Sequence, residues 1–276
     1  MKNLIKRIRF MHIKGLNKAR PAVKLFWIFA CLAVICGVLA LFMQLFAEPL
    51  FGWSSTVHRE RREIELTSLF ISVNAADIPL EVYTYGGEKI IVEYIGETAL
   101  IIEYDEYEIQ ISRVEDFTLS LFSRDVLNYK MTVWLPRETY REIKLTTASG
   151  GIYAENIYTE LMSATSRSGD IKLHRIEGLI TVSTRQGSVD AEFANFTDAC
   201  AIEAESGEVR ITMPEKAAVN LTFLTDTGRL TSDFFRREYH AHEGDMYLVS
   251  GANPLRFTVR TSSGNLEFYK RNETIQ

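Results

Sequence analysis

From Leu66 onward the chain alternates apolar and polar residues in short runs that are rich in Ile, Val, Thr, Tyr and Phe. Side chains that face inward recur at every second residue of a β-strand, so this alternation predicts short strands with one buried face. A helical period is almost absent from the same region. Residues 66–270 are therefore predicted to form an all-β domain.

A corner that contains glycine recurs along this domain, with sequences such as Thr-Ser-Arg-Ser-Gly and Arg-Thr-Ser-Ser-Gly. Successive glycines are 19, 18, 20, 21 and 36 residues apart, and the last interval is close to two periods or to one period with an insertion. Ala76 takes the glycine place in an earlier copy. The predicted corner glycines are Gly150, Gly169, Gly187, Gly207, Gly228 and Gly264.

Apolar residues occupy fixed places around each glycine, at odd positions before it and even positions after it. This change of parity indicates that the chain turns at the glycine and begins a new strand with its apolar face still inward. The place seven residues before the glycine holds Ile143, Met162, Ile180, Cys200, Leu221 and Phe257. Coils of 18–21 residues whose matching places stack into ladders predict a parallel β-solenoid, and a sandwich of antiparallel strands is the alternative. Cys200 is then a buried, inert thiol.

The N-terminal part of the chain has the pattern of a membrane anchor. Residues 1–24 contain eight Lys or Arg and no Asp or Glu, and 22 uncharged residues follow from Leu25 to Phe46. About 20 helical residues cross a bilayer, and basic residues stay on the cytoplasmic side. The sequence predicts a cytoplasmic tail (1–24), a single transmembrane signal anchor (25–47), a stalk (48–65), an extracytoplasmic domain (66–270) and a short tail (271–276) in the cell membrane.

Small residues share one face of the predicted transmembrane helix. That face consists of Ala30, Ala33, Gly37, Ala40 and Gln44. Small side chains let helices approach closely, so a second copy of the chain is a candidate partner there. Ordinary apolar filler in a helix that faces lipid is the alternative.

Charge and cysteine content restrict the ligands that the protein can bind and the disulfides that it can form. Residues 25–276 contain 23 basic and 36 acidic side chains, a net charge of −13, which argues against nucleic-acid binding. Cys200 is the only cysteine beyond the anchor, so the outer domain has no internal disulfide and is held together by packing.

Candidate chemistry in the outer domain is weak. Ser168 lies in a glycine corner with no Gly-x-Ser-x-Gly motif, and His174 falls on the next strand, so this serine is predicted to be structural. Asp170, Asp190 and Glu208 are the only carboxylates considered for a polysaccharide-active site.

The best metal candidates are His240 and His242, which share a strand face, together with Asp245 in the same segment. They lie in the irregular interval between Gly228 and Gly264, where polar residues are common, so a solvated loop is the favoured interpretation. The sequence thus predicts no enzyme, no cofactor and no metal.

Three segments carry a resemblance to a known family. They are MTVWLPRETYREIKLTTASGGI, ITMPEKAAVNLTFLTDTGRL and LRFTVRTSSGNLEFYK. Their Leu-Pro or Met-Pro strand ends and Ser-Gly corners resemble the bacterial adhesin-like domain of unknown function in LiaG-like envelope proteins, over about residues 66–270. The resemblance implies a solenoid-like β fold and roles in surface adhesion or envelope stress, and it carries no catalytic residues.

Three hypotheses of function remain open. The first is a non-enzymatic, membrane-anchored module that binds an envelope protein or polymer. The second is a regulatory or sensory component of an envelope-stress response, which acts through the helix face and the basic tail. A polysaccharide-active enzyme is the third and weakest.

Overall fold

The computed structural model describes Cys36 and residues 57–96, 98–104, 107–113, 129–235 and 246–271. The chain divides into two compact units, Met1–Thr56 and Val57–Gln276. Within the described residues, no helix has the length and apolar character needed to span a membrane. Apart from Cys36, the predicted anchor lies outside the described residues, as does its packing face Ala30, Ala33, Gly37, Ala40 and Gln44.

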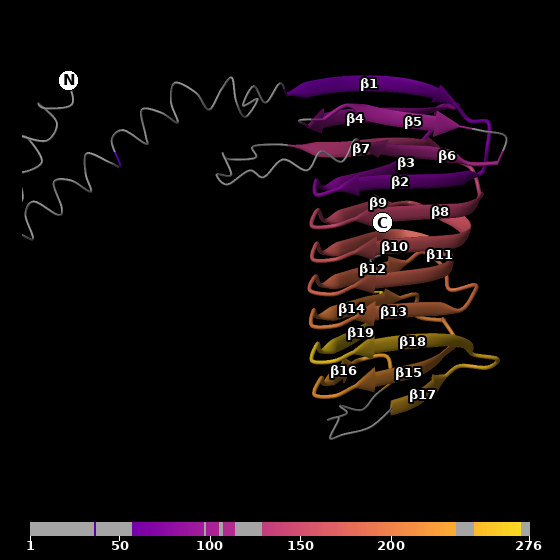
Figure 1. Ribbon diagram of the computed structural model, residues 1–276. Coiled ribbons are helices and arrows are strands. Elements are labelled where there is room, and N and C mark those ends of the chain that lie inside the picture. Colours follow the sequence, from indigo (N-terminus) through magenta and orange to yellow (C-terminus); the bar gives the residue numbers. More distant parts are fainter. Residues whose placement is uncertain are drawn as a thin grey trace, which may run out of the picture. The chain divides into compact units, whose positions relative to one another are not determined.

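The second unit is all-β and is built from two sheets that share strand β11 (Figure 1). Sheet A consists, in spatial order, of β1 (His58–Glu65), β4 (Lys89–Gly96), β7 (Lys130–Pro136), β3 (Leu80–Tyr85), β9 (Ile152–Glu155), the first part of β11 (Ile171–Thr184), β12 (Val189–Phe193), β14 (Val209–Met213), β19 (Leu266–Lys270) and β16 (Leu230–Ser232).

Sheet B follows the same axis. It consists of β5 (Leu100–Tyr104), β6 (Ile109–Arg113), β2 (Phe70–Ala76), β8 (Tyr140–Thr147), β10 (Tyr158–Ser166), the second part of β11, β13 (Cys200–Ala204), β18 (Leu255–Thr261), β15 (Val219–Thr225) and β17 (Met246–Ser250).

Each coil runs from a strand of sheet B through a corner into a strand of sheet A, and it pairs in parallel with its neighbours. The inward ladder predicted from the sequence is present, because Ile143 pairs with Met162, Met162 with Ile180, and Ile180 with Cys200. All four side chains are buried. Antiparallel pairs occur only toward the ends, at β1–β4, β4–β7, β5–β6 and β15–β17, among the strands that the structure describes. The architecture is therefore solenoid-like in its middle, with antiparallel strand pairs toward its ends.

Coils at both ends lie out of chain order, which differs from the stacking of successive coils expected from the sequence. At the C-terminal end, β18 and β19 lie between β13/β14 and β15/β16, so the last coil is inserted one layer inside the stack (Figure 1). At the N-terminal end, β2 and β3 lie between β6/β7 and β8/β9. Both terminal coils are thereby paired on each side.

Two details of the predicted organisation are wrong. The last eight residues of the predicted stalk form β1, an edge strand that pairs antiparallel with β4. The many charged residues of β1 are also typical of a linker, which is why the sequence does not predict a strand here. In the structure, Arg61 forms an ion pair with Glu93 at 3.2 Å and Glu65 forms one with Lys89 at 2.7 Å. Charged residues also protect a sheet edge from pairing with other chains.

The second correction concerns the first corner, where Ala76 does not hold the glycine place. A bulge shifts the register of β2 against β8, and Ala76 pairs with Thr147. Ile78 occupies the place beside Gly150, because a Cβ on Gly150 would lie 1.9 Å from its carbonyl oxygen. A shift of two residues preserves the parity of the strand, so the apolar pattern fits both registers.

Candidate binding groove

The corner glycines form one column in which each residue stacks on the next. A Cβ added to Gly169 would lie 2.0 Å from the carbonyl oxygen of Gly150, and one added to Gly187 would lie 2.1 Å from that of Gly169. The column continues from Gly207 to Gly264 and then to Gly228, in the spatial order of the coils. Neighbouring corners are thus in contact backbone to backbone, and a side chain on the inner side of the turn would separate them.

A second column, of buried hydroxyl groups, lies three residues before these glycines. The amide of Gly169 donates a hydrogen bond to Ser166 Oγ at 2.9 Å, and the amide of Gly187 donates to Thr184 Oγ1 at 3.1 Å. Thr261 Oγ1 donates to the carbonyl of Gly264 at 2.8 Å. Ala204 interrupts this column at the Gly207 corner. The hydroxyls satisfy polar groups of the tight turn that would otherwise be buried without partners.

Backbone hydrogen bonds hold the outward residues of adjacent corners in register. The amide of Arg167 donates to the carbonyl of Ala148 at 3.0 Å, and the amide of Arg185 donates to that of Arg167 at 3.2 Å. The amide of Ser262 donates to the carbonyl of Glu205 at 3.0 Å. Side chains two residues before each glycine therefore project along one line beside the corner.

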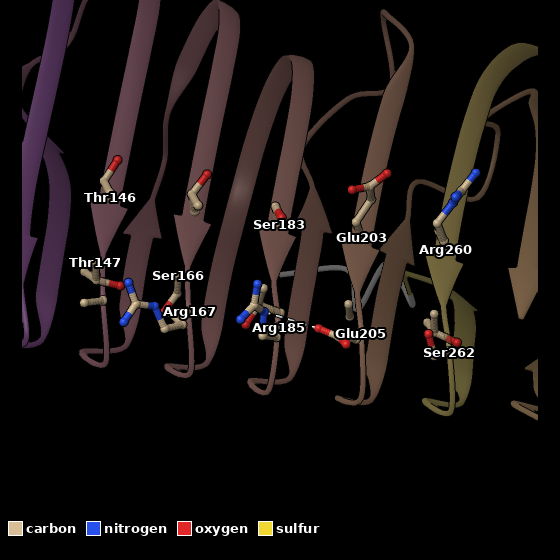
Figure 2. A pocket seen from close by; sticks show the side chains of 15 residues that line it. Thr146, Thr147, Ser166, Arg167, Ser183, Arg185, Glu203, Glu205, Arg260 and Ser262 are labelled. Atoms are coloured by element: carbon tan, nitrogen blue, oxygen red, sulfur yellow. Dashed lines mark ion pairs between the residues drawn. The ribbon is translucent and has the colours of Figure 1, made fainter. Parts of the chain in front are cut away.

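A groove of about 550 Å³ runs along the outward face of sheet B next to this line. Figure 2 shows two rows of side chains that cross successive strands. The outer row, four residues before the glycines, contains Thr146, Thr165, Ser183, Glu203 and Arg260. The row at the corner contains Ala148, Arg167, Arg185, Glu205 and Ser262. Five neighbouring strands contribute, so at ~4.8 Å per strand the groove is roughly 20 Å long.

The floor of the groove is recessed because Thr146, Thr165 and Ser183 have short side chains. Within the described part of the chain, the side chains of Thr146, Thr165 and Ser183 form no hydrogen bond, and their hydroxyls face outward. Arg185 Nε lies 3.4 Å from Glu205 Oε2, whereas the exposed Arg167 forms no ion pair with any described residue. The groove offers hydroxyl and guanidinium donors to a ligand that lies across the strands.

The outward face of sheet A is covered by side chains that contact each other. His174 Nε2 lies 2.7 Å from Glu192 Oε2, and Arg210 Nε lies 2.8 Å from Glu267 Oε2. The rings of Tyr83 and Tyr153 have centroids 5.6 Å apart. Burial, with a hydrogen bond to Glu155 at 2.9 Å, raises the pKa of Tyr153 to about 12.

The three carboxylates considered from the sequence do line one depression. Asp170, Asp190 and Glu208 border a smaller groove of about 190 Å³ on sheet A. Asp170 Oδ1 accepts a hydrogen bond from the amide of Ser188 at 2.8 Å, and Arg210 lies among these acids. Among the described residues, no group of three or more His, Cys, Asp or Glu side chains has the arrangement of a metal site. Asp170 therefore links two successive coils, and all three acids lie beside Lys172 and Arg210 in this groove.

Other candidate residues have structural positions. Ser168 lies in the exposed turn, and His174 lies on sheet A between Glu155 and Glu192, so the two do not form a nucleophile and base. Cys200 is buried, as predicted, and burial raises the pKa of its thiol to about 12, which disfavours the reactive thiolate. His240, His242 and Asp245 lie outside the described residues.

Sequence reasoning missed the residues that line the groove. The column directly after the glycines contains Asp170, Ser188 and Glu208, and its mixed charge indicates a solvated edge. The informative column lies two residues before the glycines, where Arg167 and Arg185 occupy equivalent places in consecutive coils. Aligning the outward places of the repeat, as well as the inward ones, exposes this signal.

Comparisons with known proteins support the fold. A family model described as Toastrack DUF4097 matches residues 63–268. A crystal structure of a "putative cell adhesion protein" from Clostridium sporogenes is similar with a TM-score of 0.50 and 16% identity, over 78% of this chain and 100% of that one. A "putative adhesin" from Bacteroides fragilis is similar with a TM-score of 0.33 and 12% identity, over 78% and 98% of the two chains. No curated protein matches the sequence.

Proposed function

Because the chain belongs to the Toastrack DUF4097 family, whose model spans its β domain, we propose that the protein is a non-enzymatic binding module of the cell envelope. Its ligand is a linear, polar polymer that lies in the groove on sheet B. The observation that carries this proposal is the groove across five strands of sheet B, in which the hydroxyls of Thr146, Thr165 and Ser183 lie beside Arg167 and Arg185. On sheet A, by contrast, long side chains contact each other and leave a smaller groove.

Shape and chemistry of the groove both favour an extended ligand. It is open along its length, and roughly 20 Å accommodates several repeating units of a polymer whose repeat is close to the ~4.8 Å strand spacing. Hydroxyl groups recur at that spacing on three neighbouring strands, at Thr146, Thr165 and Ser183, so successive units meet similar groups there. Repeat proteins commonly bind along such extended surfaces and need no enclosed pocket.

The location in the envelope rests on the N-terminal sequence. The uncharged run from Leu25 to Phe46, after a strongly basic segment, has the composition of a signal anchor with the β domain outside the cytoplasm. Treatment of intact cells with a protease that cannot cross the membrane tests this orientation. We expect residues 57–276 to be cleaved while residues 1–24 remain protected, and the reverse pattern overturns the orientation.

Binding is tested with the full-length protein in detergent micelles and three fluorescently labelled polymers. The probes are polygalacturonate, its methyl ester and poly(glycerol phosphate), with fluorescence anisotropy as the measurement. Thr165→Trp fills the floor of the groove and should weaken binding by at least about tenfold. Ser163→Trp is the matched control, because Ser163 lies on the same strand and face but does not line the groove.

Two outcomes contradict the proposal. One is that none of the three polymers binds. The other is that Thr165→Trp and Ser163→Trp bind as well as the wild type, which would place the ligand elsewhere. Thermal unfolding of both variants should match that of the wild type, because both sites face outward.

A further inference from the structure

We infer that the groove is selective for polymers with repeating anionic groups, and that Arg167 is the principal residue that recognises them, with Arg185 beside it. This inference rests on the proposed function and names its ligand class. The shared chemistry is an oxyanion, either the carboxylate of a uronate or the phosphodiester of a polyol phosphate. Guanidinium groups bind both kinds of oxyanion through paired, charge-assisted hydrogen bonds.

On the two coils next to Arg167, none of the described residues that line the groove is acidic, and the acids of the groove, Glu203 and Glu205, lie two strands away, on and directly after β13. The neighbours of Arg167 in the corner row are Ala148 on one coil and Arg185 on the next. The outer row beside it presents the hydroxyls of Thr146, Thr165 and Ser183. Arg167 is exposed and forms no ion pair with a described residue. A cation next to a second cation and to neutral donors attracts an anion with little competition.

Arg185 forms an ion pair with Glu205, so its guanidinium is only partly available to a ligand. Its ion pair with Glu205 is long, at 3.4 Å, and both side chains are largely exposed, at 69% and 61%. Exposed pairs of this kind contribute little stability. An anionic ligand can therefore displace Glu205 at small cost, and Glu205 limits the affinity of the groove for anions.

Position in the molecule makes these arginines unusual. Residues 25–276 carry a net charge of −13, and the smaller groove on sheet A is bordered by Asp170, Asp190, Glu208 and Glu267. The arginine pair is a local basic site in an acidic domain, which directs an anionic polymer to sheet B and away from sheet A.

The experiment compares polymers that share one backbone and differ in charge. Full-length protein in micelles should bind polygalacturonate at least about tenfold more tightly than its methyl ester, with the difference shrinking as salt increases. Arg167→Gln should weaken binding of the acidic polymer by about tenfold, and Glu205→Gln should strengthen it by about threefold. Arg137→Gln is the matched control, because Arg137 is an exposed arginine in the turn between β7 and β8 and does not line the groove.

The outcomes separate this inference from the proposed function. Equal binding of polygalacturonate and its methyl ester, both blocked by Thr165→Trp, overturns the anion selectivity and leaves polymer binding intact. Tighter binding of poly(glycerol phosphate) than of polygalacturonate supports the inference and identifies phosphate as the source of the charge. Equal losses in Arg167→Gln and Arg137→Gln overturn it, as does binding to vesicles of anionic lipid alone.

Discussion

On the outward face of sheet A, long side chains of neighbouring coils contact each other, whereas on sheet B a row of short hydroxyls leaves a groove beside the corner. Lys130 Nζ lies 3.0 Å from Glu81 Oε2 on sheet A, and the rings of Tyr83 and Trp134 are stacked with centroids 6.5 Å apart. On sheet B, Thr165 and Ser183 occupy comparable outward places. Both faces cover one shared apolar interior.

This difference shows which positions of the repeat determine which property. Inward places set the fold, and apart from the hydroxyl column beside the corners they are largely apolar. Outward places are free to vary, and their side-chain length decides whether a face is closed or hollow. A repeat defined only by its apolar ladder therefore says little about what the protein binds.

The largest expected effect comes from breaking the corner that both faces share. In Gly187→Ala, the new Cβ would lie 2.1 Å from the carbonyl oxygen of Gly169, so the coils must move apart. We expect a loss of about 2–3 kcal/mol in the free energy of unfolding, measured by urea denaturation. Gly86→Ala is the control, since nothing lies within 4 Å of its added Cβ. An unchanged midpoint for Gly187→Ala would show that the corners are not closely stacked.

Removing the aromatic cover of sheet A tests whether that face serves stability alone. Trp134→Ala deletes a half-buried ring that stacks on Tyr83, and we expect a loss of about 1–2 kcal/mol in the free energy of unfolding. Binding of polygalacturonate should remain within about twofold of the wild type. A loss of binding larger than that of Thr165→Trp would place the ligand on sheet A and contradict the proposed groove on sheet B.

The change of stability at alkaline pH tests whether water reaches the apolar interior around Cys200. Burial raises the pKa of Cys200 from 9.0 to about 12, so the folded state keeps a proton that the unfolded chain loses. This contribution to stability is complete below pH 9 and is lost as the pH rises toward 12. Between pH ~8 and ~10.5, the free energy of unfolding of Cys200→Val should fall by about 1–2 kcal/mol less than that of the wild type, as measured by urea denaturation. Parallel pH profiles for the two proteins would show that water reaches the thiol.

The smallest effect concerns the gap in the hydroxyl column under the groove. Ala204→Ser would supply an acceptor for the amide of Gly207, as Ser166 does for Gly169 at 2.9 Å. We expect a gain of about 0.5–1 kcal/mol in the free energy of unfolding. Ala164→Ser places the same hydroxyl in the buried ladder two residues before Ser166, and it should destabilise by about 1–2 kcal/mol. A loss of stability in Ala204→Ser would argue against the capping role.

Much of the fold follows from the sequence because burial imposes period and parity. The places of Ile143, Ile180 and Cys200 in one ladder are readable from their distance to the glycine. The order of the coils is not readable in this way. Leu221 and Phe257 hold equivalent places in the pattern, and only the path of the intervening chain decides which coil lies next to Cys200.

The groove was harder to predict than the ladder. Its existence depends on several outward residues being short while Arg167 and Arg185 flank them, and each of these residue types is common on any protein surface. Strand β1 was missed for a related reason, since charged residues fit a linker and a protected sheet edge equally well. The resemblance to LiaG-like proteins and the membrane anchor remain predictions.

The insertion of each terminal coil inside the stack limits how such a protein changes length during evolution. Between β9 and β14, chain order and spatial order agree, so a duplicated segment of about twenty residues adds one more layer and gives each flanking coil an equivalent parallel neighbour. A copy added after β19 would begin between β14 and β16, where no free edge exists. Longer and shorter relatives should therefore differ by whole coils in the middle, with both ends kept constant.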